Sequence, residues 1–93
     1  MKLSDYLVEY LYKMGITDYF GYQGTMIAHF IDSIGKNCKV KNHVCYNEQG
    51  AAFEAVGYAK LTGKNVCAYS TSGPGATNLI TGIADAYYDS VPV

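Results

Sequence analysis

Apolar residues recur every three or four positions in four stretches of the chain, a spacing that predicts helices. The predicted helices cover residues 5–14, 25–35, 48–62 and 77–90. Ser4 and Asn47 are the predicted N-caps of the first and third helices, because their side chains can accept a hydrogen bond from the first turn. Glycine closes or follows the first three helices, at positions 15, 35 and 63, where it readily ends a helix.

Three short β-prone runs lie between these helices, at residues 17–22, 39–46 and 65–71. The third is almost continuous in β-prone residues, which is typical of a strand buried on both faces. Strands that alternate with helices predict βαβ units with right-handed crossovers, and hence an α/β fold with part of a doubly wound parallel sheet. The last residues, Val-Pro-Val (91–93), are interpreted as the start of a fourth strand, so we expect residues 1–93 to be a truncated part of a domain.

Composition favours one small globular unit and argues against several function classes. The chain is 49% hydrophobic and 16% charged, which suits a packed domain. Its formal net charge of −1 provides no basic field for nucleic acid or for an anionic membrane surface. The first ten residues contain no long apolar stretch, so we expect no secretory signal, and no apolar run is long enough to span a membrane. We therefore expect a cytoplasmic protein with no nucleic-acid or membrane partner.

The histidines and cysteines do not form a metal-ligand pattern. His29 and His43 each lack a second histidine or cysteine at ligand spacing, and the three cysteines (Cys38, Cys45 and Cys67) contain no CxxC pair. We expect reduced cysteines, structural histidines and no metal site in this chain.

Three predicted loops follow the carboxyl ends of the strands and should meet at one edge of the sheet, where ligands bind in open α/β folds. The loops are Tyr22-Gln23-Gly24, Asn47-Glu48 and residues 72–75. Two of them contain glycine, which lets a ligand or another backbone approach closely. Glu48 supplies a carboxylate, so the sequence predicts a binding site at this edge.

Two interpretations of Glu48 are open at this point. An acid in the first turn of a helix interacts favourably with the helix dipole, by a few tenths to ~1 kcal/mol. Alternatively, a partly buried carboxylate at a ligand edge exchanges a proton with a bound heterocycle or substrate. The small residues that follow Glu48 would let another element pack closely on this helix; they are Gly50, Ala51, Ala52, Ala55, Gly57 and Ala59.

The glycine-rich segment 72–76 does not match the common phosphate-binding motifs. A dinucleotide fingerprint requires a third glycine at position 78, where the chain has Asn78, and an acid at a strand end about 20 residues later. The chain contains no GxxxxGK[ST] element, so a P-loop is excluded. A non-catalytic nucleotide-binding α/β module is the alternative from another function class.

Two blocks of the sequence resemble a known family. NEQGAAFEAVGYAKLTGK (47–64) and TSGPGATNLITGIADAYYDSVPV (71–93) are similar to the N-terminal pyrimidine-binding domain of thiamine diphosphate enzymes, especially the acetolactate synthase group. The likeness begins at LVEYLYKMGITDYFGYQG (7–24) and covers nearly the whole chain. It implies that residues 1–93 are the N-terminal part of a parallel α/β domain that continues past position 93, with the remaining domains outside this chain.

The resemblance also implies roles for individual residues. In the family, the glutamate after the second strand contacts N1′ of the aminopyrimidine ring and assists removal of the thiazolium C2 proton; Glu48 matches it. Tyr22 and Gly24 match the first loop of the pyrimidine pocket, and Pro74 and Asn78 match positions that line it. The implied activity is that of a thiamine diphosphate-dependent transferase or lyase, which decarboxylates a 2-keto acid such as pyruvate and transfers the two-carbon unit to an acceptor.

The first loop departs from the family pattern. Many acetolactate synthases have Tyr-Pro-Gly-Gly where this chain has Tyr22-Gln23-Gly24-Thr25. The resemblance implies that Gln23 and Thr25 lie near the substrate, where loss of the proline alters loop stiffness and Thr25 adds bulk and a hydroxyl. An acetolactate synthase-like carboligase is favoured, with another 2-keto-acid decarboxylase or a 2-hydroxyacyl-CoA lyase as alternatives.

The family holds the cofactor diphosphate and Mg²⁺ through a GDG…N element of a C-terminal domain, and this chain contains no GDG. The two half-sites usually come from different subunits, so the resemblance implies a homodimer or a higher homo-oligomer. It also predicts that the 93-residue segment alone is inactive. A degenerate partner chain that offers only the pyrimidine half-site is a further alternative; the retained Glu48 argues against degeneracy but is compatible with a split enzyme.

Overall fold

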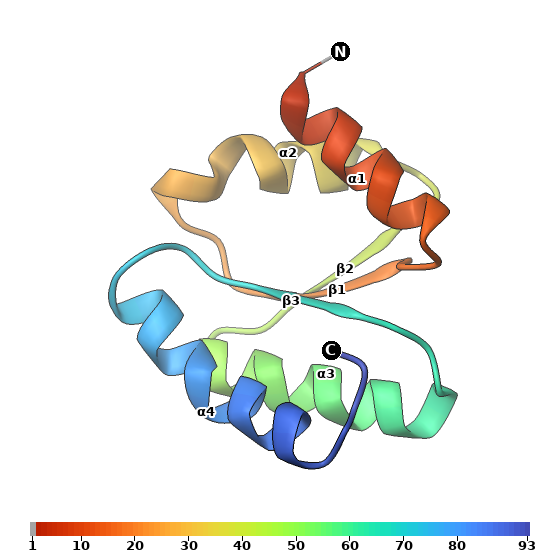
Figure 1. Ribbon diagram of the computed structural model, residues 1–93. Helices are drawn as coiled ribbons and strands as arrows, with labels where there is room; N and C mark the ends of the chain where they lie inside the picture. Colours follow the sequence, from red (N-terminus) through yellow and green to blue (C-terminus); the bar gives the residue numbers. More distant parts are fainter. Residues whose placement is uncertain (1) are drawn as a thin grey trace.

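The computed structural model describes residues 2–93, in which strands alternate with helices as predicted (Figure 1). In chain order, the elements are α1 (Leu3–Lys13), β1 (Asp18–Gly21), the 3₁₀ helix η1 (Thr25–Ile27), α2 (Ala28–Lys36), β2 (Lys41–Val44), α3 (Glu48–Thr62), β3 (Cys67–Tyr69) and α4 (Pro74–Tyr88). Among these residues, no helix is both long and apolar enough to cross a membrane.

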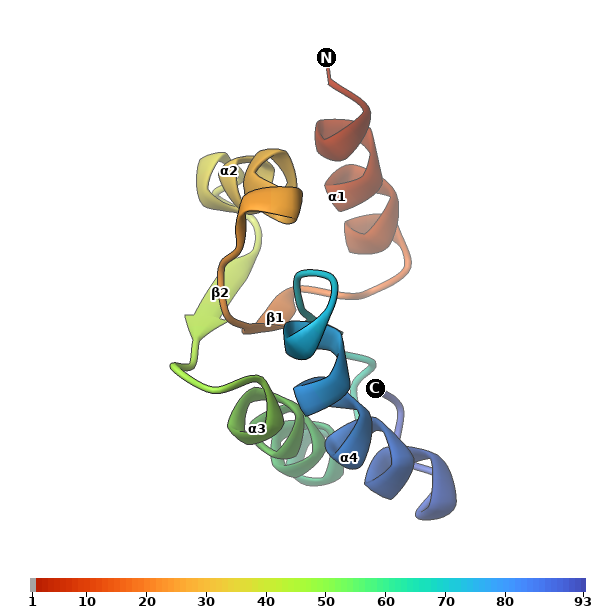
Figure 2. The ribbon, with the colours of Figure 1, turned by 90° about the vertical axis from the view of Figure 1, so that its left-hand side faces the viewer.

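The three strands form one parallel sheet in the order β2-β1-β3. Helices α1 and α2 cover one face of this sheet, and α3 and α4 cover the other (Figures 1 and 2). The prediction of an α/β fold with a doubly wound parallel sheet is confirmed. Because all strands run the same way, their carboxyl ends lie at one edge, and the segments that follow them begin there.

Each face of the central strand β1 contributes to its own core. Tyr19 belongs to the cluster under α1 and α2, with Val8, Ile34 and Tyr69. The next residue, Phe20, points to the opposite face, as alternation along a strand requires, and packs with Ala51, Ala55, Ala59 and Val66. The small residues of α3 therefore allow that helix to lie close to the sheet.

The ends of α3 are where the sequence places them. The Asn47 side chain accepts a hydrogen bond from the Gly50 N–H at 3.1 Å and caps the helix. Gly63 ends it in the left-handed conformation, with a φ of 71°. The helix α4 begins at Pro74, three residues earlier than predicted, because proline is well suited to the first turn of a helix.

Three predictions about the ends of elements are wrong. The helix α1 begins at Leu3, before Ser4, and the Ser4 hydroxyl lies 2.8 Å from Ser33 Oγ on α2 rather than capping its own helix. Gly35 lies inside α2, which continues to Lys36. Residues 91–93 form no strand, although the Val66 N–H donates to the Pro92 carbonyl at 3.0 Å and so holds this segment beside the start of β3.

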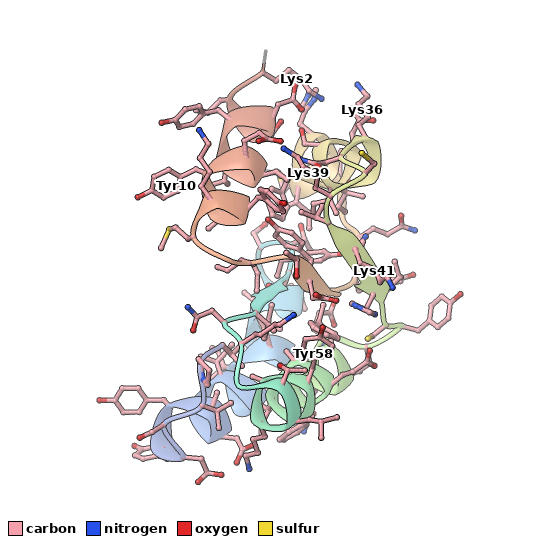
Figure 3. All side chains as sticks on the ribbon, turned by 90° about the vertical axis from the view of Figure 1, so that its right-hand side faces the viewer. Lys2, Tyr10, Lys36, Lys39, Lys41 and Tyr58 are labelled. Atoms are coloured by element: carbon pink, nitrogen blue, oxygen red, sulfur yellow. The ribbon has the colours of Figure 1, made fainter. Side chains whose placement is uncertain are left out.

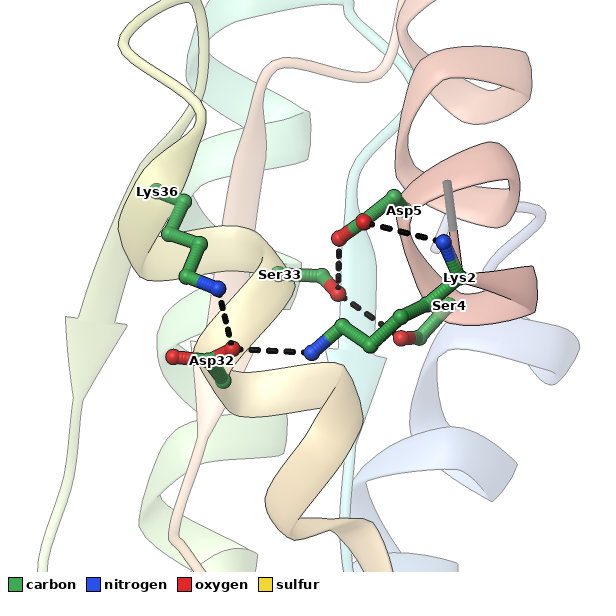
Figure 4. A network of polar contacts seen from close by, with 6 residues as sticks. All are labelled: Lys2, Ser4, Asp5, Asp32, Ser33 and Lys36. Carbon is green, nitrogen blue, oxygen red and sulfur yellow. Dashed lines mark hydrogen bonds and ion pairs between the residues drawn. The ribbon is translucent and has the colours of Figure 1, made fainter.

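A polar network joins α1 to α2 (Figure 4). The buried Ser33 hydroxyl donates to the Asp5 carboxylate at 2.6 Å. The Asp32 carboxylate pairs with Lys2 Nζ at 2.8 Å and with Lys36 Nζ at 3.0 Å, and the hydrogen bonds from these two lysines lower its pKa to about 2. This network links the amino end of α1 to α2, in addition to the apolar cluster that contains Val8 and Ile34.

A second polar cluster surrounds Asp18 at the start of β1. Its carboxylate receives hydrogen bonds from Tyr58 of α3 at 3.1 Å and from Thr17 at 2.8 Å, and His43 Nε2 of β2 lies 2.8 Å away. Figure 3 labels Tyr58, which belongs to α3. Burial opposes ionisation of Asp18, but these hydrogen bonds outweigh it and hold the pKa of the carboxyl below its usual value. The His43 ring also stacks on Phe20, with ring centroids 4.4 Å apart. His43 is thus part of the packed structure, beside Phe20 on the neighbouring strand.

Candidate functional site

The segments that follow β1, β2 and β3 meet at the carboxyl edge of the sheet. Thr71, just after β3, lies between Gly24 of the first segment and Gly75 of the third. The carboxylate of Glu48, from the second segment, lies beside Gly75 and Asn78. The structure therefore brings together the glycine loops and the acid that the sequence analysis placed at this edge.

Glu48 is the first residue of α3 and is half-buried. Its Oε1 accepts a hydrogen bond from Asn78 Nδ2 of α4 at 3.2 Å. Its Oε2 lies 3.4 Å from the position that a Cβ atom would occupy on Gly75. The amino end of α3 favours a negative charge here, and the side chain also reaches across to a second helix. Both interpretations of Glu48 are thus compatible with its position.

Two glycines are required by close approach at this edge. A Cβ atom on Gly24 would collide with the Thr71 side chain, and one on Gly75 would lie 2.9 Å from Thr71 Cγ2. Gly73 has a φ of 71°, which permits the turn between β3 and α4. Thr71 was missed by the sequence analysis; its signal was a hydroxyl residue at a strand end, directly before a glycine-rich loop.

The other predicted cofactor residues flank the same edge. Tyr22 is half-buried and contacts Tyr46 edge-on, with ring centroids 6.0 Å apart, which joins the first segment to the second. Pro74 is exposed in the first turn of α4, and Asn78 is exposed one turn later. Both therefore border the region occupied by Glu48 and Gly75.

The predicted substrate-proximal residues lie on the other side of the first loop. Gln23 and Thr25 are exposed and line a cavity of about 520 Å³ with Gly24 and three residues of α2: Ala28, Ile31 and Asp32. Glu48 does not line this cavity. The structure thus places Gln23 and Thr25 beside Gly24, without bringing them to the Glu48 carboxylate.

Metal-ligand and thiolate chemistry have little support in the described part of the chain. Within residues 2–93, no three His, Cys, Asp or Glu side chains gather in a way that could hold a metal ion. Burial raises the pKa of the Cys67 thiol to about 11, and burial together with a hydrogen bond to Glu54 does the same for Cys45. Both thiols are therefore protonated at neutral pH and are poor nucleophiles.

The carboxyl edge of the sheet in this α/β structure therefore carries a carboxylate, an amide and two glycines. Ligands bind outside the carboxyl ends of parallel strands in open α/β folds, and a half-buried carboxylate such as Glu48 can hold or exchange a proton there.

Comparison with known proteins identifies the class. Over residues 1–93 the chain matches the family described as "Thiamine pyrophosphate enzyme, N-terminal TPP binding domain", and it belongs to that family. It is 46% identical over 93 residues to the acetolactate synthase isozyme 2 large subunit of Escherichia coli (strain K12). The match covers 100% of this chain and 17% of that protein. It is 45% identical over 92 residues to the chloroplastic acetolactate synthase 2 of Nicotiana tabacum, covering 99% of this chain and 14% of that protein.

A third relative is the acetolactate synthase large subunit of Lactococcus lactis subsp. lactis (strain IL1403), 44% identical over 90 residues, or 97% of this chain and 16% of that protein. The chain thus spans less than a fifth of the length of these relatives. The resemblance to the thiamine diphosphate enzymes and to the acetolactate synthase group is confirmed.

Proposed function

We propose that residues 1–93 form the aminopyrimidine half-site for thiamine diphosphate in an acetolactate synthase-like enzyme. This enzyme would decarboxylate a 2-keto acid such as pyruvate and transfer the two-carbon unit to an acceptor. The observation that carries the proposal is the Glu48 carboxylate, which lies at the carboxyl edge of the sheet beside Gly75 and accepts a hydrogen bond from Asn78. Family membership and the acetolactate synthase relatives support it.

The residues at this edge fit the aminopyrimidine end of the cofactor. Gly24 and Gly75 both lie against Thr71, so the segments after β1 and β3 pack closely beside Glu48, which offers a carboxylate to a ring nitrogen. Tyr22, Gly24, Pro74 and Asn78 would line the ring, and Glu48 would hold or move the proton at N1′. When bound, thiamine diphosphate supplies the electron sink that a 2-keto-acid decarboxylation requires.

The surroundings of Glu48 suit this role. Its half-buried position limits contact with water, and a proton-exchanging group works better when it is positioned than when it is freely solvated. The amino end of α3 and the Asn78 amide both hold the carboxylate in place.

Other parts of the enzyme would complete the site. We propose that a C-terminal domain holds the diphosphate and Mg²⁺, that the protein is a homodimer or a higher homo-oligomer, and that residues 1–93 alone are inactive. A cytoplasmic location without nucleic-acid or membrane partners also stays a prediction. Membership in the thiamine pyrophosphate family argues against a non-catalytic nucleotide-binding module.

One observation favours a second candidate within the same class. Gln23 and Thr25 stand where many acetolactate synthases have proline and glycine, and both line the cavity along α2. This loop is therefore compatible with a substrate other than that of an acetolactate synthase. Another 2-keto-acid decarboxylase or a 2-hydroxyacyl-CoA lyase is the alternative activity.

The test is the change Glu48→Gln in the full-length protein, with thiamine diphosphate and Mg²⁺ present. We expect exchange of the cofactor's C2 proton for deuterium to slow by roughly 10²- to 10⁴-fold, the usual contribution of a proton-transfer group. Glu54→Gln is the matched control, because Glu54 is an exposed acid on the same helix. Undiminished C2 exchange in Glu48→Gln would overturn the proposed function.

A further inference from the structure

We propose that Asn78 is a positioning residue for Glu48: it engages one carboxylate oxygen, Oε1, so that the other, Oε2, is presented toward the glycine loop for proton exchange. This inference rests on the proposed function and concerns how the acid is held. It gives Asn78 a role that acts through Glu48, in addition to lining the ring.

The two oxygens of Glu48 have different surroundings. Oε1 lies 3.2 Å from Asn78 Nδ2, and this is the hydrogen bond that the Glu48 side chain makes within residues 2–93. Oε2 faces Gly75, 3.4 Å from the position of a Cβ atom there. Gly75 precedes Asn78 by about one helical turn, so one turn of α4 lies against both oxygens of Glu48.

The hydrogen bond joins two helices whose spacing is constrained. Ala52 lies one turn after Glu48 on α3, and Gly82 lies one turn after Asn78 on α4. A Cβ atom on Gly82 would overlap the Ala52 side chain, so the helices are in direct contact one turn below the site. Because both helices begin at the same sheet edge, this contact holds Asn78 within reach of Glu48 (Figure 2).

The amide of asparagine is suited to this task. Its NH₂ group donates to a carboxylate and does not titrate, so the donor is present at every pH. A carboxylate at this position would instead repel Glu48, because two carboxyl groups this close cannot both ionise easily. This also explains why asparagine, rather than the glycine of a dinucleotide fingerprint, suits position 78.

The experiment compares Asn78→Ala and Asn78→Asp with wild type in the full-length protein. The Kd for thiamine diphosphate with Mg²⁺ is measured separately from the rate of C2 deuterium exchange at saturating cofactor, across a range of pH. Thr81→Ala is the matched control, an exposed residue one turn further along α4. Because Asn78 is exposed, its variants are expected to fold, which circular dichroism checks.

We expect Asn78→Ala to slow exchange at saturation by roughly 10-fold or more, the usual effect of losing a hydrogen bond to a charged group, while Kd changes less than about threefold. Asn78→Asp should move the pH profile of exchange upward. Thr81→Ala should change neither quantity.

The inference is overturned if Asn78→Ala raises Kd but leaves exchange at saturation unchanged, since Asn78 would then only contact the cofactor. It is equally overturned if Asn78→Asp leaves the pH profile in place. These outcomes differ from failure of the proposed function, in which Glu48→Gln itself would leave exchange unchanged.

Discussion

Gly82 of α4 lies directly against Ala52 of α3, so closely that a Cβ atom on the glycine would overlap the alanine side chain. Both residues are buried, and the contact lies on the face of the molecule opposite α1 and α2. The small residues of α3 thus serve a contact within this chain. The helix carries alanines where it meets the sheet and α4 because larger side chains would push the candidate site apart.

Gly82→Ala should therefore destabilise the domain by about 1–3 kcal/mol, the usual cost of overpacking a close contact. Separation of the helices should also lengthen the hydrogen bond between Asn78 and Glu48 and slow C2 exchange. Amide hydrogen exchange of α3 and α4 in the full-length protein measures the stability change. The control is Gly57→Ala on α3, where nothing lies within 4 Å of the added Cβ.

For Gly57→Ala we expect a gain of roughly 0.5–1 kcal/mol, because alanine is the better helix former and the position is exposed. Helix propensity alone predicts a gain at both positions, so equal losses in the two glycine variants would contradict the assignment of the Gly82 effect to the contact with Ala52.

Thr71 gives a second prediction, because it obstructs Gly24 and Gly75 through different atoms. Gly75→Ala would meet Thr71 Cγ2 at 2.9 Å, whereas Gly24→Ala would meet Thr71 Cβ itself. Thr71→Ser removes Cγ2 and keeps Cβ, so it should restore cofactor affinity to Gly75→Ala and not to Gly24→Ala. Kd for thiamine diphosphate in the two double variants is the measurement. Restored affinity in both double variants, or in neither, would contradict the explanation that Thr71 blocks the two glycine positions through different atoms.

Local signals in the sequence predicted the elements well, and the differences lie at the ends of elements. Asn47 and Gly63 bound α3 as expected because capping depends on neighbouring residues alone. Ser4 misled because its hydroxyl lies against Ser33, which is 29 positions away. Gly35 misled because glycine permits a helix to end but does not require it.

At the candidate site, too, some features follow from local sequence signals and others depend on tertiary packing. The alternation of strands and helices predicts that the strands run parallel, so the edge where Glu48 and the glycine loops meet could be predicted. The hydrogen bond between Asn78 and Glu48 could not, because it depends on how two helices pack. The Asp18 cluster was missed for the same reason: Tyr58 and His43 reach Asp18 from separate elements.

Asp18 provides a pH-dependent prediction. Its pKa is lowered in the folded state, so its contribution to stability is fully present above the usual carboxyl range, near pH 4, and is lost as the pH falls through the lower folded-state pKa. Asp18→Asn should therefore reduce the free energy of unfolding by about 1–3 kcal/mol at pH 7, with a smaller difference from wild type at about pH 3. Urea unfolding of the full-length protein at both pH values measures this difference.

The control for Asp18 is Asp89→Asn, which removes an exposed carboxylate paired with Lys60 at 3.2 Å. Exposed ion pairs contribute little, so its effect should be within about 0.5 kcal/mol at either pH. A gap between wild type and Asp18→Asn that is the same at both pH values would show that Asp18 contributes through shape and not through its charge.

The network between α1 and α2 contains both a buried hydrogen bond and exposed ion pairs, so their contributions to stability can be compared. Ser33 is 2% exposed and bonds Asp5 at 2.6 Å, whereas the Asp32 side chain, with two lysine partners, is 47% exposed. Ser33→Ala should destabilise by about 1 kcal/mol, and Asp32→Asn by less, because water already competes for the exposed pairs. In about 1 M salt, where the Debye length is roughly 3 Å, the Asp32→Asn effect should vanish and the Ser33→Ala effect should persist. Amide hydrogen exchange in α1 at low and high salt tests this, and a Ser33→Ala effect that disappears with salt would mean that charge, not burial, holds α1 in place.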